Sequence, residues 1–106
     1  MPAVRYGRLD AHGTPTGDVQ ALPDVSAEHA DIASAGPHVV LVWRSFDGEA
    51  TRLRAWVSSD EGRTFQLREL DRSPDDNDHP RLLQRHREFF AVWRTLKEVR
   101  VLRVQP

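Results

Sequence analysis

The sequence predicts an all-β fold, and three observations support this prediction. Short runs rich in Val, Trp and Phe recur along the 106 residues. Gly and Pro interrupt the chain every few residues, and no long run places apolar residues at the three- and four-residue spacing of an amphipathic helix. We therefore expect short antiparallel strands joined by tight turns.

The clearest strands are expected at residues 39–46, 51–58, 89–96 and 99–104. Asp47-Gly48-Glu49 and Lys97-Glu98 separate the members of two pairs of these runs. Tight hairpin turns must lie there, and Asp-Gly tolerates the positive φ that such turns demand. Two β-hairpins follow from this spacing.

The two halves of the chain align without a gap at an offset of 50 residues. The alignment places Glu28-His29 on Asp78-His79, Ile32 on Leu82, Val39-Val40 on Phe89-Phe90, and Val42-Trp43-Arg44-Ser45 on Val92-Trp93-Arg94-Thr95. A β-propeller blade requires a repeat of this length with four short strands, because each blade buries its faces against its neighbours. The repeat therefore predicts four-stranded antiparallel propeller blades.

The blades are expected to form a single segment over residues 1–106, in three parts. Residues 1–27 would hold the last two strands of a blade, at 4–9 and 18–22. Residues 28–72 would form a full blade with strands at 31–35, 39–46, 51–58 and 65–70. Residues 73–106 would hold three strands of the next blade, the first at 81–85. The sequence thus predicts an incomplete propeller, cut out of phase with its blades.

The bulk composition excludes several classes of partner. Fifteen basic and 16 acidic residues leave a formal net charge of −1, so we expect no nucleic-acid and no membrane partner. The chain has no cysteine, no signal peptide and no apolar run near the ~20 residues of a membrane span. Zinc-ligand spacing, a P-loop and a dinucleotide fingerprint are absent, so we expect no cofactor and no metal. The compartment stays open.

One motif stands between the third and fourth strands of the full blade, Ser58-Ser59-Asp60-Glu61-Gly62-Arg63-Thr64-Phe65. Asp60 is expected to accept hydrogen bonds from its own turn, and Gly62 to take a left-handed conformation. The hydroxyls of Ser58 and Thr64 would bind turn backbone, and Phe65 would pack as the next strand begins. The motif therefore predicts a locked turn and not a reaction centre.

This motif resembles the Asp box, Ser-x-Asp-x-Gly-x-Thr-Trp/Phe, of the sialidase-like propellers that carry BNR repeats. The turn at residues 10–14 resembles a degenerate second box. The family's glycosidases use an arginine triad, a tyrosine nucleophile paired with a glutamate, and an aspartate acid/base. Tyr6 is the only tyrosine and lacks a recognisable partner, so no catalytic residue is carried over. The alternative to the family is an ordinary glycine-containing hairpin in a β-sandwich.

Two groups of residues are candidates for ligand binding. Arg44 and Arg94, each after a strand Trp, could clamp a carboxylate, or could pack between blades. The segment 71–80 carries Asp75, Asp76, Asp78 and His79, which suit sugar hydroxyls or a hard cation, or form a solvated loop capped by its own side chains. His29 and His79 recur at the repeat period and are expected to hydrogen-bond the next strand.

Three functions remain open at this stage. The chain is expected to be a non-catalytic binding module, with carbohydrate as the preferred ligand, whose copies complete a ring. Three copies would give six blades, similar to small two-blade lectins. The second possibility is the C-terminal part of a larger exported sialidase-like protein. The third is a glycosidase subunit formed only on assembly.

Overall fold

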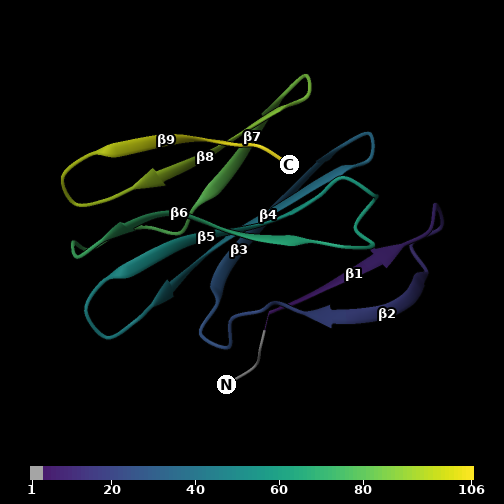
Figure 1. The fold of residues 1–106 in the computed structure, drawn as a ribbon, viewed down its shortest axis with the longest axis horizontal. Helices are drawn as coiled ribbons and strands as arrows, with labels where there is room; N and C mark the ends of the chain where they lie inside the picture. The colour runs from purple at the N-terminus through teal and green to yellow at the C-terminus, as the bar shows by residue number, and fades with distance from the viewer. Residues whose placement is uncertain (1–3) are drawn as a thin grey trace.

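The computed structural model describes residues 4–106, which form three antiparallel sheets (Figure 1). The first sheet pairs β1 (Arg5–Leu9) with β2 (Pro15–Ala21). The second has the order β3 (Glu28–Ala35), β4 (His38–Phe46), β5 (Thr51–Ser58) and β6 (Gln66–Ser73). The third has the order β7 (Arg81–Arg85), β8 (Glu88–Arg94) and β9 (Val99–Val104). No helix occurs among these residues and no sheet closes on itself, so the all-β prediction is confirmed.

Most strands lie within a few residues of their predicted positions, and the differences arise at turns. Strand β8 ends at Arg94 and not at residue 96, because Thr95 opens the next turn by accepting the N–H groups of Lys97 and Glu98 on its hydroxyl. Strand β2 begins at Pro15, three residues before the predicted start, because backbone hydrogen bonding between Asp10 and Thr14 already closes the preceding turn. Local hydrogen bonds therefore decide these strand ends.

The middle sheet, β3 to β6, is buried on both faces along β4, whereas β5 is buried on one face and half-buried on the other. Successive residues of β4 from Val39 to Trp43 are all buried, although their side chains alternate between the two faces. A strand of this kind requires another layer on each side of its sheet. The sheets β1–β2 and β7–β9 supply these layers, on opposite sides of the middle sheet (Figure 1).

The layer formed by β7–β9 covers the face of the middle sheet that carries Val40 and Val42. Its inward side chains form one continuous core with that face; the fully enclosed members are Val40, Val42, Leu53, Ala55, Phe89, Ala91 and Trp93. The first strands of the two sheets, β3 and β7, lie side by side. A hydrogen bond of 2.8 Å from the Leu82 N–H to Asp31 Oδ2 joins them.

The hairpin β1–β2 covers part of the opposite face. Tyr6 is buried there in a cluster with Leu41 and Trp43. Its ring meets the ring of Phe65 edge to face at 5.1 Å, and Phe65 stacks on Trp56 at 4.1 Å. The Tyr6 ring also lies directly against the α-carbon of Gly62, which has a φ of +82°. The hairpin is therefore held on the sheet through the 58–65 turn.

Replacing Gly62 should test this contact. In Gly62→Ala the new Cβ would overlap the Tyr6 hydroxyl in addition to the cost of a left-handed alanine, which is about 1 kcal/mol. Gly13→Ala is the matched control, because Gly13 has a φ of +81° and open space around the Cβ position. Chemical denaturation should show a larger loss of unfolding free energy for Gly62→Ala. Equal losses would contradict the Tyr6 contact.

Candidate functional site

The antiparallel topology divides the turns between two ends of the sheets. The turns β1–β2, β3–β4, β5–β6 and β7–β8 lie at one end, which we call the turn end. The turns β4–β5 and β8–β9 lie at the other end, together with the segments 22–27 and 74–80 that connect one sheet to the next; we call it the link end. The predicted motif and the predicted ligand-binding residues of segment 71–80 therefore lie at opposite ends.

The 58–65 turn at the turn end is closed by a dense set of hydrogen bonds. Asp60 Oδ1 accepts the N–H groups of Arg63 and Thr64 at 3.1 and 2.9 Å, as expected. Ser58 Oγ accepts the Gly62 N–H at 2.9 Å and donates to Asp60. The prediction for Thr64 was wrong: its hydroxyl donates to Asp60 Oδ2 at 2.6 Å and not to backbone, because the carboxylate is the stronger acceptor.

These hydrogen bonds make Asp60 unsuited to general acid or base catalysis. The hydroxyl and N–H of Thr64, the hydroxyl of Ser58 and the N–H of Arg63 together hold the pKa of the Asp60 carboxyl far below its usual range. A carboxylate with so low a pKa is a poor general acid or base near neutral pH, since its conjugate acid is hardly populated. Asp60 thus acts as the centre of a structural turn.

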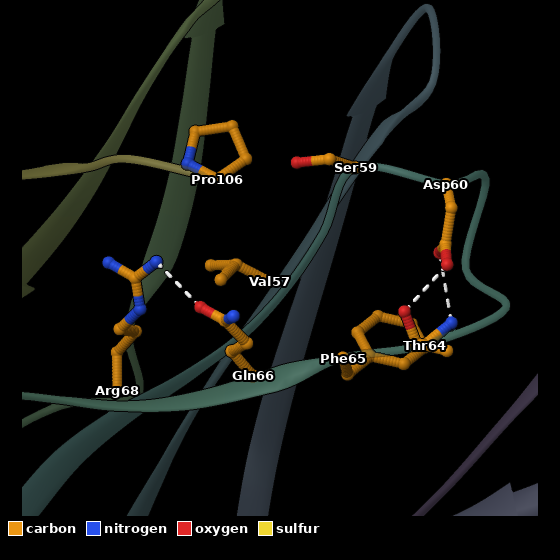
Figure 2. A pocket seen from close by; sticks show the side chains of 8 residues that line it. All are labelled: Val57, Ser59, Asp60, Thr64, Phe65, Gln66, Arg68 and Pro106. Carbon is orange, nitrogen blue, oxygen red and sulfur yellow. Dashed lines mark hydrogen bonds between the residues drawn. The ribbon is translucent and has the colours of Figure 1, made fainter.

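A hollow of about 340 Å³ adjoins this turn and runs along β6 toward the C-terminus (Figure 2). Its lining includes Asp60, Phe65, Gln66, Arg68 and Pro106. The carboxylate of Asp60 points toward Thr64, while Arg68 Nη2 donates to Gln66 Oε1 at 3.2 Å (Figure 2). The polar groups of the hollow are thus largely engaged with one another, and their arrangement resembles no acid–nucleophile pair.

At the link end, segment 74–80 is fastened to the strands around it. The Asp78 N–H donates to the carbonyl of Arg94 at 2.8 Å, and the Leu96 N–H donates to the carbonyl of Asp76 at 2.7 Å. The indole of Trp93 donates to the Asp78 carbonyl at 3.0 Å. The backbone of this segment is therefore fixed by its neighbours, so its side chains are presented from a defined surface.

The structure places the four predicted residues of this segment differently. Asp75 is half-buried and lies 3.6 Å from the Lys97 ammonium. Asp76, Asp78 and His79 are exposed, with His79 Nδ1 at 3.7 Å from an Asp78 oxygen. The three exposed side chains remain accessible to a ligand.

The two predicted arginines have separate environments. Arg44 donates to the backbone oxygen and to the side-chain oxygen of Asn77 at 2.6 and 3.0 Å, and its Nε lies 3.2 Å from a Glu28 oxygen. Arg44 thereby joins the middle sheet to segment 74–80, and its guanidinium is committed to protein groups. Arg94 is exposed. The arginine that packs on an indole is Arg100, which lies 5.7 Å from the ring of Trp93.

His29 and His79 lie together, but not through the hydrogen bonds to a neighbouring strand that the sequence predicts. Their rings stack on each other with centroids 5.3 Å apart and an interplanar angle of 25°. Both side chains are exposed, and His29 has a φ of +52°. The repeat period thus brings the imidazole of His29 on β3 and that of His79 in segment 74–80 to the same seam.

Sequence reasoning missed Asp24, the most enclosed acidic group of the link end. Its side chain is only 7 % exposed. The carboxylate accepts hydrogen bonds from the Trp43 indole, the Ser45 hydroxyl, the Ser26 N–H and Arg54, at 3.1, 3.2, 3.0 and 3.4 Å. Burial alone would raise the pKa of Asp24, but these donors outweigh it and hold the pKa below its usual range. Asp24 is therefore an anchor for the first link.

Among residues 4–106, no group of three or more His, Cys, Asp or Glu side chains is placed to hold a metal ion. Over the same residues, no helix has the length and apolar character needed to cross a bilayer.

Comparisons with protein-family models, with curated proteins and with solved structures find no significant match to this chain. The function must therefore be argued from the geometry of the molecule itself.

Replacing Asp24 should destabilise the protein. Asp24→Ala leaves the Trp43 indole and the Ser45 hydroxyl without their acceptor, which costs about 2–4 kcal/mol of unfolding free energy. Asp18→Ala on exposed β2 is the control and should stay within ~0.5 kcal/mol of the parent.

The same pair of proteins gives a pH test. Because the folded-state pKa of Asp24 is lower than 3.8, the carboxylate's stabilisation is complete above that pH and is lost as the pH falls toward the folded-state pKa. The stability gap between parent and Asp24→Ala, measured by denaturation at several pH values, should narrow in acid. A gap that widens in acid would exclude this role.

Proposed function

We propose that this chain is a non-catalytic module of propeller-blade type, with a binding and structural role, which is completed by association with copies of itself. One observation carries the proposal. The outward face of β7–β9 has a partly exposed apolar centre flanked by charged side chains, whereas the corresponding residues Val40 and Val42 of the middle sheet are fully buried.

The register of the third sheet defines this outward face. The cross-strand neighbours Leu83 and Phe90, and Val92 and Val101, lie on it together. Leu83 is 58 % exposed and Val101 is 62 % exposed. Their middle-sheet counterparts at the repeat offset include Val40 and Val42, which are fully buried. An exposed apolar patch at the centre of a sheet favours a further layer.

The propeller assignment rests on the repeat and on the order of the sheets. Sheets of two, four and three strands follow one another along the chain, and the middle one is covered on both faces. This arrangement supports stacked blades over a two-layer sandwich. The turn at residues 10–14 supports a second Asp-box-like element, since Asp10 Oδ1 accepts the N–H groups of His12 and Thr14. Three copies would supply six blades.

The alternative is that the chain is part of a larger exported sialidase-like protein, in which further blades of the same polypeptide cover the exposed face. In that case the partner surface is intramolecular. The two readings share the same blade packing and differ only in the source of the next sheet.

The mass in solution separates these two readings. Light scattering coupled to size exclusion should give about three times 12.1 kDa, with circular dichroism of a β-rich protein on the same peak. A folded monomer at every concentration would contradict self-completion. An aggregating or unfolded chain would favour the larger-protein alternative, since an uncovered apolar face promotes non-specific association.

Carbohydrate is the ligand class that we propose for the link end. Asp76, Asp78 and His79 present carboxylate and imidazole groups from a fixed backbone, which suits the hydroxyl groups of a sugar. The stacked imidazoles of His29 and His79 add a flat surface beside them. Asp60 and Asp24 are both held by hydrogen bonds within the protein and lie at opposite ends of the sheets, so they do not form an acid/base pair for catalysis. The proposed role is therefore binding without catalysis.

Glycan binding provides the test of this ligand class. The parent protein should bind glycans on an array. The double variant Asp76→Ala/Asp78→Ala should bind them at least tenfold more weakly, because both substitutions remove acceptors for sugar hydroxyls. Asp18→Ala, on β2, should bind like the parent. Absence of any glycan signal from the folded protein would refute the carbohydrate proposal.

A further inference from the structure

The exposed face of β7–β9 has a counterpart elsewhere on the same molecule. We propose that copies associate head to tail, so that the outward face of β7–β8 in one copy packs into an open groove beside β3 in the next copy. This inference rests on the proposed self-association and specifies its surfaces and its polarity.

The groove lies on the face of the middle sheet that carries Val39 and Leu41. The hairpin β1–β2 covers only part of this face and leaves a space of about 350 Å³ between β1 and β3. Ile32 on β3 and Tyr6 on β1 line its two sides. Ile32 is 52 % exposed, which is unusual for an isoleucine in a strand between two layers.

The molecule already contains one interface of the proposed kind. At the repeat offset, Ile32, Val39 and Leu41 correspond to Leu82, Phe89 and Ala91. The latter three belong to the core between the third sheet and the middle sheet or pack against it. On the other side of that core, Val40 and Val42 correspond to the outward Phe90 and Val92. The outward half of the intramolecular interface therefore recurs at an exposed surface, whereas the other half recurs on a face that is uncovered only at Ile32, because Val39 and Leu41 are buried beneath β1–β2.

Hydrogen bonding at the groove is compatible with this docking. In the intramolecular interface the Leu82 N–H needs an acceptor from the neighbouring sheet and finds it in Asp31. The residue corresponding to Asp31 on the outward face is Arg81, which has no acceptor to offer. The Ile32 N–H of the groove needs none, because it already donates to Asp31 Oδ1 of its own chain at 2.9 Å. No buried donor is left unpaired at this position.

The strand count adds one structural requirement. Strand β9 and the next copy's β1 would occupy equivalent positions, since each would be the third strand of a four-stranded blade. Val104 fastens β9 into the core with 2 % exposure, whereas β1 belongs to a hairpin of only two strands. Docking of β9 at this place therefore requires β1 of the receiving copy to shift away from β3, with loss of the Tyr6 contacts to Phe65 and Gly62.

Two exposed single substitutions test the polarity. Leu83→Glu places a charge on the outward face and Ile32→Glu places one in the groove, so each variant alone should be monomeric in size exclusion with light scattering. In an equimolar mixture, the intact outward face of Ile32→Glu should pack into the intact groove of Leu83→Glu and form a one-to-one dimer. The dimer should grow no further, because its remaining face and its remaining groove each carry a glutamate. Leu96→Glu, in the β8–β9 turn at the link end, is the control and should associate like the parent. Circular dichroism checks that each variant is folded.

Three results would overturn the proposal. If only Leu83→Glu is monomeric and Ile32→Glu associates normally, the outward faces pair with each other in a symmetric dimer. If the mixture stays monomeric, the face and the groove are not partners. If the parent protein is itself a folded monomer, self-association fails as a whole, which separates that failure from an error in polarity alone.

Discussion

The two-sided burial of strand β4 is the constraint on which the rest of the structure depends. The consecutive residues from Val39 to Trp43 are all buried, and their side chains alternate between the two faces of the sheet. Because a single sheet cannot cover its own faces, another layer must cover each of them. The middle sheet is consequently stable only between two other layers. The buried carboxylate of Asp24 anchors the connecting segment 22–27, and the hydrogen bond from the Leu82 N–H to Asp31 joins β7 to β3.

Much of this architecture could be predicted from the sequence because its signals are local or periodic. The repeat that places Trp43 on Trp93 located the strands of both sheets, and Asp60 with Gly62 located a locked turn. Predicted strand ends were less accurate at Thr95 and Pro15, where local hydrogen bonds in the adjoining turns decide the boundary. The propeller-blade identity and its Asp-box resemblance remain proposals.

The parts of the candidate site that could not be predicted depend on contacts between residues distant in sequence. Asp24 looks like an ordinary turn residue beside Ser26, and nothing local reveals that Trp43 and Arg54 converge on it. Arg44 was predicted as a ligand-binding residue because the sequence does not reveal that its guanidinium donates to Asn77, 33 residues further along the chain. The stacking of His29 on His79 likewise depends on how segment 74–80 lies against β3, although the repeat period had already paired these residues.

The most direct test of the central claim is amide hydrogen exchange by NMR on the folded protein. If the layers stabilise each other, amides of β4, β5 and β8 should share one high free energy of opening, close to that of global unfolding. The hairpin β1–β2, which covers less of its face, should open at lower free energy. Independent, low-energy opening of β7–β9 while β4 and β5 keep full protection would contradict the account, because the middle sheet would then be stable without its second layer.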